Sequence, residues 1–357
     1  MEEKRQIVRD YVAQGIKLEE CLGLAKMSKS SYYYKRNYKV GGKTKTHHSL
    51  HRGVEVPDGQ VVETIKGLLG EEFLDYGYRK VTTYLQRQGY ALGKKKVYRL
   101  MSENNLTQPL KPKNNQFDKD IVKSKPRATK PLQIIEIDIK YVYIDGLQRN
   151  AYLITMYDIF HREAYVWTLN LSMTSKKLIE LILKFVDQEL ITKQIDPKHL
   201  EISFRTDNGS QFISKVYRAL MKRFGFKNVY IPPATPQLNG HIESFHSTVQ
   251  KLVCDKYELR DLEHANDVFE RFFTTYNNMR YLTCLLDHAP KEFIKLWESG
   301  VIDQKQHKNK FIFFFKEKDE QQKQLSDNVA SIPSPEVNLE KSQDFVCFQN
   351  KDIVNLP

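Results

Sequence analysis

Residues 134–144 decide the fold of this chain, and they run Ile-Ile-Glu-Ile-Asp-Ile-Lys-Tyr-Val-Tyr-Ile. Side chains alternate along the segment. One face carries Ile135, Ile137, Ile139, Tyr141 and Tyr143, and the other carries Glu136, Asp138, Lys140 and Val142. A period of two is the pattern of a β-strand whose two faces meet different surroundings. The sequence therefore predicts a strand that carries Asp138 on its polar face.

Strands and helices follow this segment along the chain. The apolar patterns predict strands at 152–160 and 163–169, a helix from Thr174 or Ser175 to about Leu190, a strand at 200–206, a helix at 210–224, a strand at 227–231 and a helix at 240–257. Three antiparallel strands, and then strands that alternate with helices, predict an α/β sheet covered by helices on both faces.

Two helical segments precede the sheet. Residues 4–36 and 58–107 each contain three short apolar faces separated by turns, and the third helix of each is basic. Helix-turn-helix modules present a recognition helix to the major groove of DNA in this way. For the first segment, a small three-helix core that binds nothing is an equally good interpretation.

These patterns predict six domains and connecting segments. They are a helix-turn-helix unit at 1–40, a linker at 41–57, a second helix-turn-helix unit at 58–107, a basic Pro/Lys linker at 108–130, an α/β catalytic core at 131–297 and a partly disordered tail at 298–357.

The charge of the chain favours a polyanionic partner. It has 56 Lys and Arg against 44 Asp and Glu over 357 residues, which leaves a net charge of +12. Between Tyr76 and Ser102 there is no acidic residue to compensate the positive charges, so an ordinary solvated face is the weaker explanation. Nucleic acid is the first candidate. The predicted DNA-binding residues are Arg79, Lys80, Lys94, Lys95, Lys96 and Arg99 in the second unit, and Lys35 and Arg36 in the first.

The cysteines and the apolar runs of the sequence indicate the cellular compartment of the protein. The four cysteines lie far apart in the sequence, which excludes a zinc ribbon or a disulfide framework and suits a reducing cytosol. No apolar run approaches the ~18 residues that span a membrane, and the first residues do not resemble a signal peptide. We expect a cytoplasmic protein with no membrane partner.

Three carboxylates carry the predicted chemistry: Asp138, Asp207 and Glu243. Asp207 follows a predicted strand, Glu243 lies near the start of a predicted helix, and 35 residues separate the two. Clustered carboxylates repel one another unless a cation lies between them, and hard oxygen ligands favour Mg²⁺ or Mn²⁺. Two such ions ~3.5–4 Å apart can activate the attacking oxygen and stabilise the leaving oxygen of a phosphoryl displacement. Each residue alone is better explained as an ordinary strand, turn or helix-surface residue, whereas the three together predict a metal site.

The motifs around these carboxylates resemble the catalytic domain of retroviral-type integrases and insertion-sequence transposases. The best match is the large bacterial family whose transposase is often split between two overlapping reading frames. The resemblance covers residues 58–297 and rests on Asp138, on Tyr157-Asp158 with Arg162, on Thr206-Asp207-Asn208-Gly209-Ser210-Gln211-Phe212, on Asn239-Gly240 with Glu243-Ser244-Phe245, on Tyr276-Asn277-Asn278 with Arg280, and on Tyr76-Gly77-Tyr78-Arg79.

The resemblance implies an RNase H-like core and a DNA transposase activity. Asp138, Asp207 and Glu243 would bind two Mg²⁺ (or Mn²⁺) ions. The protein would bind the terminal repeats of its element in double-stranded DNA, cleave a phosphodiester and join the freed 3′-hydroxyl to target DNA. It would assemble as a homo-oligomer on DNA, associated with the bacterial nucleoid.

This chain departs from the family pattern at four positions. Ile135 replaces a tryptophan, Lys140 a threonine and Leu282 a histidine. Gln250 replaces a basic residue that contacts DNA in the family, and we assign that role to its neighbour Lys251. Two alternative functions stay open: a DNA-binding regulator without catalysis, and a metal-dependent nuclease that cuts without joining.

Overall fold

The computed structural model describes residues 2–33, 46–108, 126–196, 200–232, 239–307 and 310–316. Lys35 and Arg36, two of the predicted DNA-binding residues, lie outside these ranges. The chain divides into two compact units, residues 1–47 and residues 48–357. Within the described ranges, no helix is both long enough and apolar enough to cross a membrane.

The first unit is a small three-helix bundle. Its helices are α1 (Glu2–Ala13), α2 (Leu18–Leu24) and α3 (Lys29–Tyr33). They pack around a core centred on Val8, Cys21 and Leu22. The hydroxyl of Ser28 accepts the backbone N–H of Ser31 at 3.2 Å and so caps α3. The three helices match the sequence pattern, and DNA recognition by this unit stays a prediction.

The second unit begins with a β-hairpin where the sequence predicted a linker. Strands β1 (His48–His51) and β2 (Val54–Pro57) pair antiparallel around a turn at Arg52-Gly53. Both turn residues have positive φ, as the favoured two-residue hairpin turns require. The His51 ring stacks on Tyr90 with 4.2 Å between centroids. The prediction of a linker at 41–57 is therefore wrong for residues 48–57, because these short strands lack the apolar alternation that marks a strand.

Three helices follow the hairpin and share one core. They are α4 (Asp58–Gly70), α5 (Tyr78–Arg87) and α6 (Lys94–Glu103). Their buried side chains include Ile65, Val81, Leu85 and Val97. The apolar spacing in the sequence predicted each of these helices.

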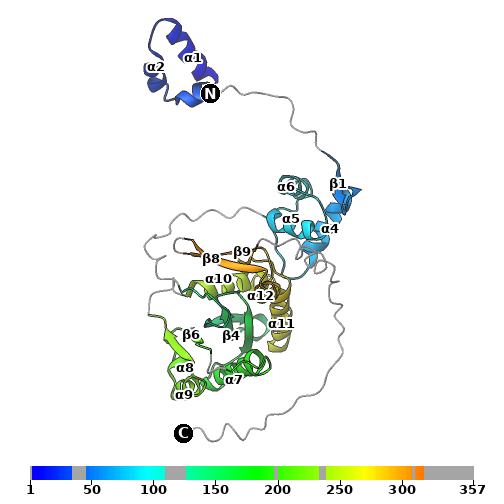
Figure 1. The fold of residues 1–357 in the computed structure, drawn as a ribbon, viewed down its shortest axis with the longest axis vertical. Helices are drawn as coiled ribbons and strands as arrows, with labels where there is room; N and C mark the ends of the chain where they lie inside the picture. Colours follow the sequence, from blue (N-terminus) through cyan, green and yellow to red (C-terminus); the bar gives the residue numbers. More distant parts are fainter. Residues whose placement is uncertain are drawn as a thin grey trace. The chain divides into compact units, whose positions relative to one another are not determined.

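The largest sheet has five strands in the order β5-β4-β3-β6-β7 (Figure 1). The strands are β3 (Ile134–Ile144), β4 (Arg149–Asp158), β5 (Ala164–Asn170), β6 (Ser203–Thr206) and β7 (Lys227–Tyr230). β3, β4 and β5 form an antiparallel meander, whereas β6 runs parallel to β3 and β7 runs parallel to β6. β3 therefore lies at the centre, with a neighbour on each edge.

Helices cover both faces of this sheet, as the sequence predicted. Ile135 and Ile137 are buried on the face covered by α7 (Ser175–Phe185) and α9 (Lys215–Phe224). Val142 and Ile144 are buried on the opposite face, against α10 (Gly240–Val249) and α11 (Leu262–Asn278). Both α7 and α10 continue as π-helical turns, Val186–Ile191 and Gln250–Cys254.

Two details differ from the sequence expectation. The predicted helix 210–224 is two helices, α8 (Ser210–Ile213) and α9, because the Ser214 hydroxyl accepts the N–H of Tyr217 and starts a new helix. Part of the predicted tail is ordered: α12 (Pro290–Glu298) is followed by a hairpin of β8 (Ile302–His307) and β9 (Lys310–Phe315). Phe313 of this hairpin packs against Phe160 and Phe293. Residues 317–357 lie outside the described ranges.

The turn between β4 and β5 encloses a buried charged group. Asp158 is fully buried, and its carboxylate accepts the backbone N–H groups of Leu132 and Phe160 and the hydroxyl of Tyr165. His161 lies between Asp158 and Glu163, with its ring nitrogens 3.6 and 2.9 Å from their oxygens. Burial by itself would lower the pKa of His161, but the two carboxylates raise it to about 9.

From the raised pKa of His161 we predict that the folded protein loses stability at alkaline pH. Because the pKa of His161 is raised in the folded state, its contribution is complete below pH 6.5 and disappears as the pH rises through about 9. We expect the free energy of unfolding to fall by about 3 kcal/mol across that window. Denaturant titrations of the wild type and of His161→Gln at several pH values test this. Equal pH dependence of the two proteins would contradict it.

Candidate active site

Asp138 and Asp207 are each two residues beyond the last paired position of the neighbouring parallel strands β3 and β6. The pairing of β3 with β6 places Glu136 opposite Arg205. Continued by two residues, the same register places Asp138 opposite Asp207, directly after the last residue of β6. Polar groups at the carboxyl ends of parallel strands face one crevice in α/β sheets. Two of the three predicted carboxylates thus occupy equivalent positions of the extended register, with Asp138 within β3 and Asp207 directly after β6.

The third carboxylate is carried by α10, and a buried glutamate attaches this helix to β3. Glu136 has no exposed surface, and its Oε2 accepts the N–H of Ile242 at 2.9 Å. Glu243 is the next residue on the helix. Burial raises the pKa of Glu136 to about 7, while the Ile242 N–H and the Arg205 guanidinium act in the opposite direction. Glu136 therefore connects the strand of Asp138 to the helix of Glu243.

The sequence analysis did not identify Glu136 as a functional candidate. The signal was present, because a charged residue inside a predicted strand, two residues before Asp138, shares the face that carries Asp138. His246 was also missed. Its Nδ1 lies 3.4 Å from Oδ2 of Asp138, and it lies three residues after Glu243, so the two side chains share a side of α10.

The three carboxylates are not gathered into one cluster. No three His, Cys, Asp or Glu side chains among the described residues lie close enough together to hold a metal ion. Asp207 is exposed, and its Oδ1 accepts the N–H of Gly209 at 2.9 Å, which is the hydrogen bond of an Asx turn. Oδ1 of Asp138 accepts the N–H of Ile139 at 2.9 Å. The donor chemistry of three carboxylates suits a hard divalent cation, and mutual repulsion opposes their close approach.

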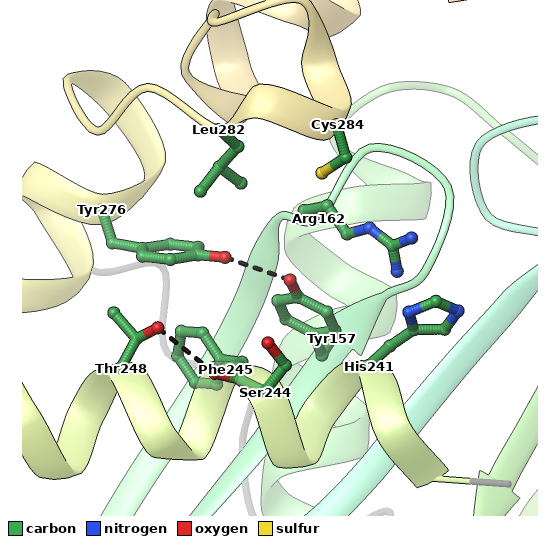
Figure 2. A pocket seen from close by; sticks show the side chains of 9 residues that line it. All are labelled: Tyr157, Arg162, His241, Ser244, Phe245, Thr248, Tyr276, Leu282 and Cys284. Carbon is green, nitrogen blue, oxygen red and sulfur yellow. Dashed lines mark hydrogen bonds between the residues drawn. The ribbon is translucent and has the colours of Figure 1, made fainter. Parts of the chain in front are cut away.

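A pocket of about 190 Å³ opens on another side of α10 (Figure 2). Its walls come from β4, the β4–β5 turn, α10, the end of α11 and the loop after it: Tyr157, Arg162, His241, Ser244, Phe245, Thr248, Tyr276, Leu282 and Cys284. The hydroxyls of Tyr157 and Tyr276 are hydrogen bonded at 3.0 Å. Glu243 and Thr248 are five residues apart, so at 3.6 residues per turn they lie ~140° apart around the helix. The pocket is therefore separate from the carboxylates.

Two of the predicted DNA-binding residues in α6 form ion pairs with Asp58. Lys96 lies 2.7 Å and Arg99 lies 3.1 Å from the two carboxylate oxygens of Asp58, at the start of α4. Ser49 also donates to this carboxylate at 2.7 Å. The argument that these cations have no compensating acid is therefore wrong for Lys96 and Arg99, because folding brings the acid from a different helix.

The other predicted cations differ in exposure. Arg79, Lys94 and Lys95 are exposed. Lys80 is half-buried, with its ammonium 5.5 Å from the centroid of the Tyr76 ring. Lys251 forms an ion pair with Asp75. Arg79, Lys94 and Lys95 are thus the candidates that the fold leaves on the surface.

Family models match most of the second compact unit. An HTH-like domain matches residues 58–114, and integrase core domain models match residues 128–236 and 225–284. The integrase core contains the sheet, Asp138, Asp207 and Glu243. The chain thus contains an integrase core domain at 128–284 with an HTH-like domain before it, and it is similar to insertion-sequence transposases. Its core has the RNase H-like fold, and the HTH-like domain precedes it.

Individual relatives are similar along most of their length. InsK of insertion sequence element IS150 from Escherichia coli K12 is 23% identical over 296 residues, which is 80% of this chain and 96% of that protein. The transposase of insertion sequence element IS904 from Lactococcus lactis is 25% identical over 245 residues, which is 65% of this chain and 92% of that protein. A structure of the HTLV-2 integrase catalytic core with magnesium aligns at a TM-score of 0.37 and 16% identity, over 47% of this chain and 99% of that one.

The link between Glu136 and α10 of this integrase core domain can be tested by measuring the stability of the protein. Glu136→Ala leaves the Ile242 N–H without its acceptor, which costs about 1–3 kcal/mol. Glu136→Gln keeps a carbonyl oxygen that can accept this N–H, so its cost should be clearly smaller. Urea unfolding of the two variants and the wild type measures the difference. Equal costs for Ala and Gln would contradict the role of this hydrogen bond.

Proposed function

We propose that this protein is a DNA transposase that cleaves phosphodiesters at the ends of its element and joins the 3′-hydroxyl ends to target DNA. The observation that carries the proposal is the placement of the acids. Asp138 lies on β3 two residues after the Glu136–Arg205 pair, and Asp207 directly follows β6. The helix that carries Glu243, α10, is hydrogen bonded to β3 through Glu136 and Ile242.

Asp138, Asp207 and Glu243 are the residues that would hold two Mg²⁺ or Mn²⁺ ions. Bound divalent ions of this kind activate an attacking oxygen and stabilise a leaving oxygen in phosphoryl displacement. Carboxylates are the ligands that these hard cations prefer. Glu136 and His246 would hold the strand and helix that present these ligands, through Ile242 and Asp138 respectively.

The HTH-like domain would bind the terminal repeats of the element in double-stranded DNA. Its exposed cations, Arg79, Lys94 and Lys95, supply positive charge on the surface of α5 and at the start of α6. Lys94 and Lys95 lie in the first turn of α6, where the helix dipole also favours an anion such as a DNA phosphate. We further propose that the protein acts as a homo-oligomer assembled on DNA.

Removal of a single carboxylate should abolish the reaction and spare DNA binding. Asp138→Asn, Asp207→Asn and Glu243→Gln each remove a metal ligand, and a loss of ~4 kcal/mol of transition-state stabilisation is a thousandfold in rate. A labelled duplex with the element end, incubated with Mg²⁺, measures cleavage and joining separately. Asp267→Asn, which changes an exposed acid on α11, is the matched control.

Three outcomes of this assay separate the functions. Loss of both steps in all three variants, with an active control, supports the proposal. Near-wild-type joining by any one variant removes that residue from the site. Cleavage without joining by the wild type would make the protein a metal-dependent nuclease instead.

The lysines of α6 should divide into two classes. Lys94→Gln with Lys95→Gln should weaken binding to specific and random DNA about equally and reduce the slope of log K against log salt by roughly 1.8, or 0.9 for each phosphate contact. Lys96→Gln should instead lower the thermal stability of the protein, because Asp58 loses its nearest ammonium. Salt-dependent binding and thermal unfolding of both variants test this. An unchanged slope in the double variant would show that Lys94 and Lys95 do not touch DNA.

A further inference from the structure

The loop between α4 and α5 carries an aspartate that contacts the catalytic core. Asp75 has 9% of its side chain exposed. One carboxylate oxygen accepts from Arg280 at 2.6 Å, and the other forms an ion pair with Lys251. Both partners belong to the core, because Arg280 follows α11 and Lys251 lies in the π-helical turn that continues α10. A single carboxylate thus joins the HTH-like domain to two helices of the core.

Asp75 stays ionised in the folded protein and paired with Arg280 and Lys251. Burial would raise the pKa of Asp75, but Arg280 and Lys251 lower it below its usual value, so the group is ionised over the physiological range. Arg280 also donates to the backbone oxygen of Phe73 at 3.0 Å. An ion pair with little exposure and several hydrogen bonds is lost only at a large cost when one partner is removed.

Apolar contacts on both sides of Asp75 extend this junction. Phe73 is buried in the core of the catalytic domain, with its ring 5.5 Å from that of Phe272. Tyr76 is buried in the core of the HTH-like domain. Its hydroxyl donates to the backbone oxygen of Met279 at 2.9 Å and accepts the N–H of Tyr281 at 2.6 Å. The loop is thus anchored in both cores, one side chain on each side of Asp75.

The helical segment that carries Lys251 of this junction also carries Glu243, a predicted catalytic residue. Lys251 lies eight residues after Glu243 on one continuous helical segment. A shift of this segment along its axis would move Glu243 with it. The same junction also explains two sequence motifs that the catalytic chemistry leaves unused, since Tyr76 and Arg280 come from the motifs around 76–79 and 276–280.

We propose that Asp75 is a positioning residue that fixes the HTH-like domain to the helix of Glu243, so that the distance from the recognised DNA sequence to the cut phosphodiester is set by this junction. The inference rests on the proposed transposase function. DNA held by α5 and α6 would reach the carboxylates in one register only while the loop at 71–77 stays fixed to α10 and α11.

The test is a map of cleavage positions at single-nucleotide resolution. Wild type, Asp75→Asn and Lys251→Gln are compared on a labelled element end with Mg²⁺, and the affinity for the same DNA is measured without metal. Because a misplacement of 1 Å can cost about 100-fold in rate, we expect Asp75→Asn to lose about 100-fold at the correct phosphodiester while cuts spread to neighbouring positions. Affinity should stay within about twofold of wild type, because the HTH-like core is unchanged.

Two further comparisons separate a positioning effect from a general loss of folding or stability. Lys251→Gln keeps the Arg280 ion pair and should scatter cuts in the same direction, to a smaller extent. Glu63→Gln removes an exposed ion pair with Lys66 within α4, 2.8 Å apart, and should cut at the wild-type position.

The proposal is overturned if Asp75→Asn and Lys251→Gln cut only at the wild-type position, whether at full or at uniformly reduced rate. Equal scattering in Glu63→Gln would also overturn it, because Asp75 would then have no special role. A wild type that does not cut the element end would instead refute the proposed function.

Discussion

Burial of β3 on both faces is the constraint on which the rest of the core depends. The strand has a neighbour on each edge, and its side chains meet α7 and α9 on one face and α10 and α11 on the other. A charged residue inside such a strand must find partners, because an unpaired buried charge is very costly. Glu136 meets this requirement through the Ile242 N–H and Arg205. The same bond fixes the start of α10 and places Glu243 near the strand of Asp138.

Buried or half-buried carboxylates link separate segments at several places in this protein. Asp158 gathers N–H groups and a hydroxyl from both sides of the β4–β5 turn, Asp58 holds the first and third helices of the HTH-like domain together, and Asp75 joins that domain to the core. In each case one acid accepts from several donors, and for Asp58 and Asp75 these include donors that are distant in sequence. Such joints are specific, since each depends on the exact geometry of several donors, and removal of one partner leaves a charge in a poorly solvated place.

Because these acids pair with nearby cations, the net charge of the chain overstates the positive charge that is available to bind DNA. A charge of +12 favours a polyanionic partner, but Lys96, Arg99 and Lys251 are paired within the protein. Asp58 and Asp75 cancel part of the contribution of these cations to the long-range field. The positive charge on the surface of the HTH-like domain therefore comes from fewer residues than the basic stretch at 76–102 contains.

The sequence by itself determined the strands and helices of the core and the three-helix unit at 58–107, and it predicted the three carboxylates, because period-two and period-3.6 patterns and short motifs are local properties. It did not determine the hairpin at 48–57, whose strands carry no alternating pattern, or the break at Ser214. Only the tertiary structure decided which charges are free. Asp58 is 38 residues from Lys96, and Asp75 is 176 residues from Lys251. No local pattern encodes such pairs, because they form only when packing of the apolar faces brings distant segments into contact.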